Sequence, residues 1–237
     1  MNFRRATGLL VPVSDLPKVF RGVFSFRYFN SVQSECFSSA YLSDDNLVVS
    51  APTGSGKTGI FELCILRLLA RLLTPEGLFS QPRGALKIVY VAPTKALIQE
   101  KVKEWNEKFG SKSLGLICQE VTGDNEFINV KDLQDTDLIL TTPEKFDSTT
   151  RRCRDQGGAG FVGDIALVLI DEVHLLNDTR GAALEAIVSR MKMLSRYPEL
   201  KESAISRIRF VAVSATIPNI EDLGEWLMAP PRAVKRL

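Results

Sequence analysis

Hydrophobic residues along this chain fall into short runs that alternate with longer segments of helical spacing. Most of the short runs are apolar at successive positions, which predicts strands covered on both faces of a sheet. We expect strands at residues 47–50, 86–91, 114–120, 137–141, 166–170 and 208–213. We expect helices at residues 57–73, 94–109, 144–152, 182–195 and 220–227. The repetition predicts an α/β fold, a doubly wound, mostly parallel sheet with helices on both faces.

The same alternation predicts a single domain over residues 15–237, with functional groups at the carboxyl ends of the strands. Residues 1–14 are expected to form a disordered leader. Because they carry Arg4 and Arg5 and no acid before Asp15, a mitochondrial leader is the alternative.

Composition narrows the class of protein. Of 237 residues, 45% are hydrophobic and 24% charged, which is ordinary for a soluble globular domain. The net charge of +2 creates no global field for nucleic acid, so such binding would need a local patch. No apolar run is long enough to predict a membrane span. The four cysteines form no C-x-x-C pair, and the single histidine, His174, excludes a multi-histidine metal site.

Residues 51–58, Ala-Pro-Thr-Gly-Ser-Gly-Lys-Thr, fit a phosphate-binding loop between a strand and a helix. Glycines let the backbone N–H groups curl toward phosphate oxygens, and the following helix directs its dipole at the same anion. A plain glycine turn is the alternative, but the flanking strand and helix favour the loop. The predicted nucleoside triphosphate site consists of Pro52, Thr53, Gly54, Ser55, Gly56, Lys57 for the outer phosphates, and Thr58 for a magnesium ion.

The apolar run at 166–170 ends in Asp171 and Glu172. Carboxylates at a strand end are the expected partners of a phosphate-binding loop. Asp171 would hold Mg²⁺, directly or through water, and Glu172 would orient and deprotonate the attacking water. Without the loop upstream, the same pair would be no more than the start of a surface loop.

Several further motifs follow expected strands in a fixed order. Residues 92–97 read Ala-Pro-Thr-Lys-Ala-Leu, 141–145 Thr-Thr-Pro-Glu-Lys, 171–174 Asp-Glu-Val-His and 214–216 Ser-Ala-Thr. With the phosphate loop, this series resembles the superfamily-two helicases of the DExH-box type, from about Asp15 to the end. The resemblance implies a RecA-like P-loop NTPase domain that uses ATP and Mg²⁺.

Other stretches resemble one branch of that superfamily. Residues 178–181, Asp-Thr-Arg-Gly, are typical of the Ski-like and Brr-like branch, and 122–124 match a smaller element of the group. Residues 24–30, 61–68 and 142–147 are similar to its meiotic crossover DNA helicases. That likeness implies a nuclear 3′–5′ helicase acting on single-stranded or branched DNA. Ski-type RNA helicases share most of these motifs, so RNA remains open.

The resemblance also assigns roles to individual positions. Gln33, within residues 29–34, would contact adenine and favour ATP over GTP. A second group would contact a nucleic-acid backbone independently of sequence: Thr94, Lys95, Thr142 and Pro143. A third group would couple nucleotide state to strand binding: His174, Ser214 and Thr216. The basic cluster at Arg151, Arg152 and Arg154 is interpreted as a solvated turn.

Two departures from the family pattern qualify this interpretation. Gly59 follows Thr58 where relatives place an apolar residue, and a helical glycine costs about 1 kcal/mol relative to alanine, so we expect a loose first turn.

A second RecA-like domain, with its arginine finger, is not expected within these residues. Such fingers contribute about 10³–10⁵ in rate. The chain is therefore expected to bind ATP, hydrolyse it slowly and not unwind by itself. The alternatives are a truncated binding module without motor activity, or a P-loop enzyme such as a kinase, which the later motifs disfavour.

Overall fold

The fold is built on one parallel sheet. The computed structural model describes residues 9–77, 79, 85–123, 133–155, 159–174 and 181–237. In this part of the chain the strand order is β3-β4-β2-β5-β6-β1-β7, and every pairing is parallel. The predicted fold class is confirmed. The strands are β1 Leu47–Ser50, β2 Lys87–Val91, β3 Cys118–Val121, β4 Leu138–Thr141, β5 Ile165–Asp171, β6 Arg209–Ser214 and β7 Val234–Arg236.

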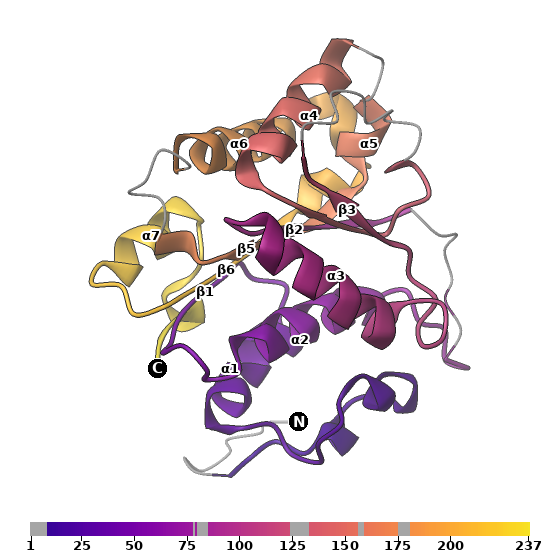
Figure 1. The fold of residues 1–237 in the computed structure, drawn as a ribbon, viewed down its shortest axis with the longest axis vertical. Helices are drawn as coiled ribbons and strands as arrows, with labels where there is room; N and C mark the ends of the chain where they lie inside the picture. The colour runs from indigo at the N-terminus through magenta and orange to yellow at the C-terminus, as the bar shows by residue number, and fades with distance from the viewer. Residues whose placement is uncertain (1–8, 78, 80–84, 124–132, 156–158, 175–180) are drawn as a thin grey trace.

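Helices cover both faces of the sheet (Figure 1). One layer contains α1 Ser31–Tyr41, α2 Lys57–Ala70 and α3 Lys95–Phe109, and the other contains α4 Pro143–Asp155, α5 Ala159–Gly163, α6 Gly181–Leu194 and α7 Ile220–Trp226. Short 3-10 helices lie at Val13–Asp15, Lys18–Val23, Pro198–Leu200, Ala204–Arg207 and Pro231–Ala233. None of the helices in the described ranges is long and apolar enough to cross a membrane.

Each strand feeds two hydrophobic cores because successive side chains point to opposite faces. On β2, Tyr90 packs in the core beneath α2 and α3, whereas Val89 and Val91 pack beneath the α4–α7 layer. The same division separates Leu169 from Ile170 on β5. Burial on both faces explains why these strands read as continuous apolar runs.

The sequence misplaced some element boundaries. β3 begins at Cys118 rather than at residue 114, because Gly115 has a φ of 79° and belongs to a turn that bonds back to Gly110. α1 was not expected as a helix, although Asn30 and Gln33 form a capping box at its start. The short edge strand β7 was also missed, since it is charged and only half-buried.

The N-terminal segment is partly packed into the core. Residues 1–8 of the expected leader lie outside the described residues. Val11 and Val13 are buried, and Pro12 pairs with Tyr28 in an isolated β-bridge. The packed domain therefore begins before Asp15.

Candidate nucleotide site and nucleic-acid interface

The motifs singled out in the sequence meet at one edge of the sheet. In the strand register, Ser50 pairs with Ser214, and Val213 pairs with Asp171. Across β2, Val91 pairs with both Ile170 and Thr141. Because the strands are parallel, the segments that follow these residues all leave from the carboxyl edge, where sites of doubly wound folds lie.

The phosphate-binding loop has the backbone geometry of an anion cradle. Gly54 and Gly56 have φ angles of 79° and 83°, in the left-handed region that favours glycine, and α2 begins directly after them at Lys57. The ammonium of Lys57 donates to the carbonyl of Ala51 at 3.2 Å. The Ser55 hydroxyl is buried and has no hydrogen-bond partner within the described structure. An unpaired buried hydroxyl in a loop with two left-handed glycines, directly before the N-terminus of a helix, fits a phosphate ligand.

Gln33 lies against this loop. Its Nε2 donates to the carbonyl of Gly56 at 3.0 Å, and its Oε1 accepts from the backbone N–H of Asn30 at 3.1 Å. Asn30 reaches the same loop, because its Nδ2 donates to the carbonyl of Ser55 at 2.9 Å. The two side chains that cap α1 therefore also fix the position of the phosphate loop.

Gly59 is explained by this contact. A Cβ at position 59 would lie 2.5 Å from Nε2 of Gln33, a distance that real Cβ atoms essentially never show. The first turn of α2 is formed, with the Gly59 N–H bonded to the carbonyl of Gly56 at 3.0 Å. The expected loose turn is not observed, and the missing side chain makes room for Gln33.

Both carboxylate oxygens of Asp171 are held in place. Tyr90 donates from its hydroxyl to Oδ2 at 2.6 Å, and the backbone N–H of Glu172 donates to Oδ1 at 3.0 Å. Burial raises the pKa of Asp171, while the Tyr90 hydrogen bond and the charge of Lys101 oppose that rise. Sequence reasoning missed Tyr90, because an aromatic residue in an apolar strand carries no signal of a polar role.

Glu172 adopts a strained backbone with a φ of 51°, unusual for a residue other than glycine. Its Oε2 is buried, lies 3.2 Å from Nδ1 of His174 and has no partner in hydrogen-bond geometry. Nδ1 of His174 lies 3.0 Å from Oγ of Ser214, and the His174 backbone N–H donates to the same oxygen at 3.3 Å. An acceptor oxygen without a donor is what a base for a water molecule requires.

Of the three residues expected to couple the motifs, His174 and Ser214 are therefore in contact, whereas Thr216 is exposed. A residue that the sequence did not single out also joins two motifs. The hydroxyl of Ser50, at the end of β1, donates to the carbonyl of Ala215 and accepts from the N–H of Ile217, both at 3.2 Å.

Two residues of the expected nucleic-acid set line one surface hollow of about 380 Å³. Lys95 and Thr142 share it with residues from α4 and the preceding loops, namely Gly123, Glu144, Lys145, Ser148 and Arg152. Thr94 is exposed and caps α3 by accepting from the N–H of Leu97 at 3.3 Å. Pro143 lines a separate small hollow beside Asp171 and Glu172.

Some expected features fall elsewhere. Arg151 and Arg152 lie in α4 rather than in a turn, and Arg151 pairs with Asp147 at 2.5 Å. Asp124 and residues 178–180, part of the family pattern, lie outside the described residues.

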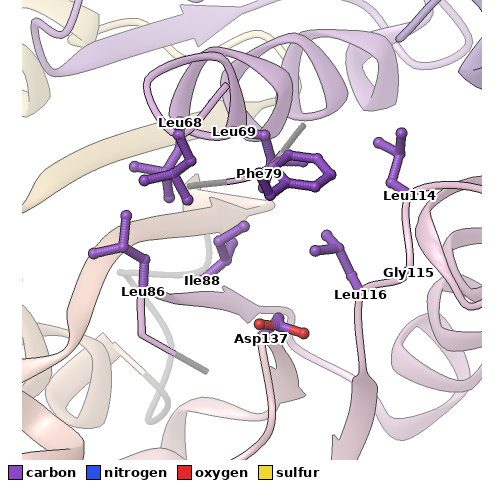
Figure 2. Close-up of a pocket in the computed structure, with 10 residues that line it drawn as sticks. Leu68, Leu69, Phe79, Leu86, Ile88, Leu114, Gly115, Leu116 and Asp137 are labelled. Carbon is purple, nitrogen blue, oxygen red and sulfur yellow. The ribbon is translucent and has the colours of Figure 1, made fainter. Parts of the chain in front are cut away.

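An apolar cavity of about 290 Å³ lies at the opposite edge of the sheet, near the amino ends of β2 and β4 (Figure 2). Among the described residues that line it, Asp137 alone is charged, and it accepts a hydrogen bond from the N–H of Ile117 at 2.8 Å. A carboxylate in apolar surroundings repels phosphate, so this cavity is not the nucleotide site. The apolar lining consists of Leu68, Leu69, Leu72, Phe79, Leu86, Ile88, Leu114, Gly115 and Leu116.

A parallel sheet with a phosphate-binding loop after β1 and an Asp-Glu pair at the end of β5, one strand further along the same edge beyond β6, defines a P-loop NTPase of the RecA-like kind. Comparison with known proteins identifies the family within this class. The profile of the DEAD/DEAH box helicase family matches residues 30–223, and the chain belongs to that family.

Individual relatives point in the same direction. The chain is 64% identical over 224 residues to the "ATP-dependent DNA helicase MER3 homolog" of Oryza sativa subsp. japonica, covering 94% of this chain and 18% of that protein. It is 40% identical to the "ATP-dependent DNA helicase MER3" of Saccharomyces cerevisiae, covering 96% and 17%. It is 39% identical to the "DExH-box ATP-dependent RNA helicase DExH13" of Arabidopsis thaliana, covering 86% and 8%. The chain spans less than a fifth of the length of these relatives.

A solved structure of the "DUF1998 helicase MrfA bound to DNA" superposes with a TM-score of 0.66, covering 98% of this chain and 31% of that one. At 21% sequence identity, this likeness concerns the fold alone.

Proposed function

We propose that this chain is the first RecA-like motor domain of a DNA helicase, binding Mg-ATP and single-stranded or branched DNA and hydrolysing ATP. One observation carries the proposal. The unpaired hydroxyl of Ser55 and the glycine cradle lie on the same sheet edge as Asp171 and the unpaired Oε2 of Glu172. A site with an anion cradle, a metal-binding carboxylate and an orphaned base is suited to phosphoryl transfer to water.

Each residue has a distinct part in this proposal. The N–H groups around Gly54 and Gly56 bind the phosphates, and Lys57 leaves the Ala51 carbonyl to pair with the outer ones. Thr58 and Asp171 would hold magnesium, which supplies positive charge against the phosphate oxygens when bound. Glu172 accepts a proton from the attacking water at Oε2, which lies 3.2 Å from Nδ1 of His174 and has no partner in hydrogen-bond geometry.

The single-stranded nucleic acid would follow the surface beside α3 and α4. Lys95 and Thr142 share one hollow with Lys145 and Arg152, so three cationic side chains outnumber the one carboxylate among the described lining residues, Glu144. Such groups bind phosphates without reading bases. The MER3 relatives are named as ATP-dependent DNA helicases, which supports DNA, whereas the DExH13 name makes RNA the alternative. A nuclear role in meiotic crossover formation with 3′–5′ polarity is proposed on the resemblance of residues 24–30, 61–68 and 142–147.

We further propose that efficient hydrolysis requires an arginine finger from a second RecA-like domain. The described half of the site offers Lys57 as its phosphate-facing cation, and arginine fingers contribute about 10³–10⁵ in rate in comparable enzymes. The chain alone should therefore bind nucleotide well, turn it over slowly and fail to separate strands.

The experiment that tests these proposals is ATP turnover by this chain without nucleic acid, with single-stranded DNA and with RNA of the same sequence. The wild type is compared with Glu172→Gln, and with Glu202→Gln, which changes an exposed glutamate, as the matched control. Stimulation by DNA that only Glu172→Gln abolishes supports the motor domain. Greater stimulation by RNA would replace the DNA proposal, nucleotide binding without any turnover would favour the binding module, and robust strand separation would contradict the need for a second domain.

A further inference from the structure

A lysine outside every motif discussed above lies at the proposed metal side of the nucleotide site. Nζ of Lys101, in the middle of α3, donates to Oγ1 of Thr58 at 3.2 Å. The Lys101 side chain is only 11% exposed. Thr58 carries the hydroxyl that would bind magnesium, so an ammonium group occupies the neighbourhood of the expected metal ion.

A ladder of charges between α2 and α3 holds this ammonium in place. Lys101 pairs with Glu104 at 2.6 Å, and Lys108 pairs with Glu104 at 2.9 Å and with Glu62 at 2.5 Å. Glu62 also accepts from Nε1 of the fully buried Trp105 at 3.2 Å. Hydrogen bonds from Lys101 and Lys108 outweigh the effect of burial and lower the pKa of Glu104. Glu104 is therefore a charged partner for Lys101.

The spacing along both helices explains how the ladder forms. Thr58 and Glu62 lie one turn apart on α2, and Lys101, Glu104 and Lys108 lie on successive turns of α3. Each of these side chains consequently contacts a residue at the same level along the facing helix. Thr58 lies at the end of this series of contacts that is next to the phosphate loop.

We propose that Lys101 is a positioning residue that acts as the resident cation of the metal side and yields to magnesium when Mg-nucleotide binds. This inference rests on the proposed function. An ammonium and a magnesium ion that share the Thr58 hydroxyl would repel each other strongly, because they would be separated by little more than one oxygen atom. Lys101 already has Glu104 as a second partner, so it can leave Thr58 and remain paired.

The proposal predicts opposite effects for the two members of one ion pair. In Lys101→Met the competing cation is lost and Glu104 keeps its charge, so magnesium should bind the nucleotide complex at about fivefold lower concentration. In Glu104→Gln the ammonium loses its alternative partner and stays at Thr58, so about fivefold more magnesium should be needed. A purely structural role would weaken binding in both variants.

The test is a titration of Mg²⁺ into this chain with a fluorescent ADP analogue, read as nucleotide affinity, with the melting temperature in EDTA as a measure of folding. Lys101→Arg, which keeps the charge, should behave as wild type, and Lys103→Met, which changes an exposed lysine on the same helix, is the matched control. Opposite shifts in the two variants support the inference. Equal shifts, or no shift while the wild type responds to magnesium, overturn it. A wild type that binds nucleotide without any response to magnesium overturns the proposed metal site and this inference with it.

Discussion

The hydroxyl of Tyr90 donates a 2.6 Å hydrogen bond to Oδ2 of Asp171 from inside the hydrophobic core. Tyr90 is fully buried, and its ring meets those of Phe61 and Trp105 edge to face, at centroid distances of 5.8 Å and 5.0 Å. The strand next to β5 therefore sets the orientation of the proposed metal-binding carboxylate. Partners of this kind decide how well a ligand side chain is presented to its ion.

Tyr90→Phe should reduce ATP turnover and magnesium affinity by about 10–100-fold, the range seen when partners of metal ligands are removed. The ring and its packing are retained, whereas Oδ2 of Asp171 loses its donor in a buried position. The measurement is kcat and the magnesium dependence of nucleotide binding. Tyr197→Phe, at a half-exposed position, is the control. Unchanged values in Tyr90→Phe would show that the Glu172 N–H alone orients the carboxylate.

Gly59→Ala should lower nucleotide affinity, because the new methyl group would displace the side-chain amide of Gln33 from the Gly56 carbonyl. The free energy of unfolding should fall by no more than about 1 kcal/mol, the usual contribution of one hydrogen bond. The group that the methyl meets is the movable end of a side chain, and alanine is favoured over glycine in a helix by about 1 kcal/mol. Urea denaturation and nucleotide binding measure the two effects. Gly22→Ala, where a Cβ would meet nothing within 4 Å, should show neither.

Arg209→Met should lower the free energy of unfolding by about 2–4 kcal/mol, because it leaves carbonyl groups without donors in the interior. The guanidinium is buried and donates to the carbonyls of Ser39, Ala40 and Asp45, at 2.6, 3.1 and 2.7 Å. It thereby joins the end of α1 to β6. Urea denaturation gives the loss directly, and Arg207→Met, at an exposed site, is the comparison. A loss no larger than in that control would mean that water replaces the guanidinium.

The ion pair between Asp44 and Arg67 should give a pH-dependent contribution to stability. The two-pronged hydrogen bond from Arg67, at 3.0 and 2.9 Å, holds the pKa of Asp44 below its ordinary value of 3.8. A carboxylate with a lowered folded-state pKa stabilises the fold above its ordinary pKa, and this contribution is lost as the pH falls through the folded-state pKa. Asp44 is half exposed, so screening limits the gain to about 0.5 kcal/mol.

Asp44→Asn should therefore be less stable than wild type near neutral pH, and the difference should shrink as the pH falls below 3.8, the ordinary pKa of the carboxyl. Chemical denaturation near neutral pH and in acid below that pKa makes the comparison. A deficit of the same size at both would show that the effect of the substitution comes from shape rather than charge.

The sequence predicts the role of a residue when that role is signalled by residues next to it in the chain. The phosphate loop, Asp171 and Glu172 could be proposed as site residues from the sequence, because their spacing along the chain is the signal. Tyr90, Ser50 and Lys101 were not, because their roles arise only when strand register or helix packing brings them to a distant residue. The buried strands were predicted well for a related reason, since burial on both faces leaves a continuous apolar run.

The boundaries were less predictable where a single residue overrides the local pattern. Gly115 interrupts the strand that the apolar run at 114–120 predicts, and the Asn30–Gln33 cap starts a helix in a segment without helical periodicity. Gly59 predicts a loose first turn of α2 from the sequence alone, because the position of Gln33, which fills the space beside it, is set by the fold.

The close approach of Gly59 to Gln33 also constrains how this sequence can diverge. The two positions lie 26 residues apart in the chain, yet the space that one leaves is filled by the side chain of the other. A relative that carries a side chain at position 59, as the family pattern does, must therefore turn the end of the residue at position 33 elsewhere. In such a relative a glutamine at position 33 should lose its hydrogen bond to the carbonyl at position 56, so the way in which this side chain holds the phosphate loop should differ between helicases with and without a glycine at position 59.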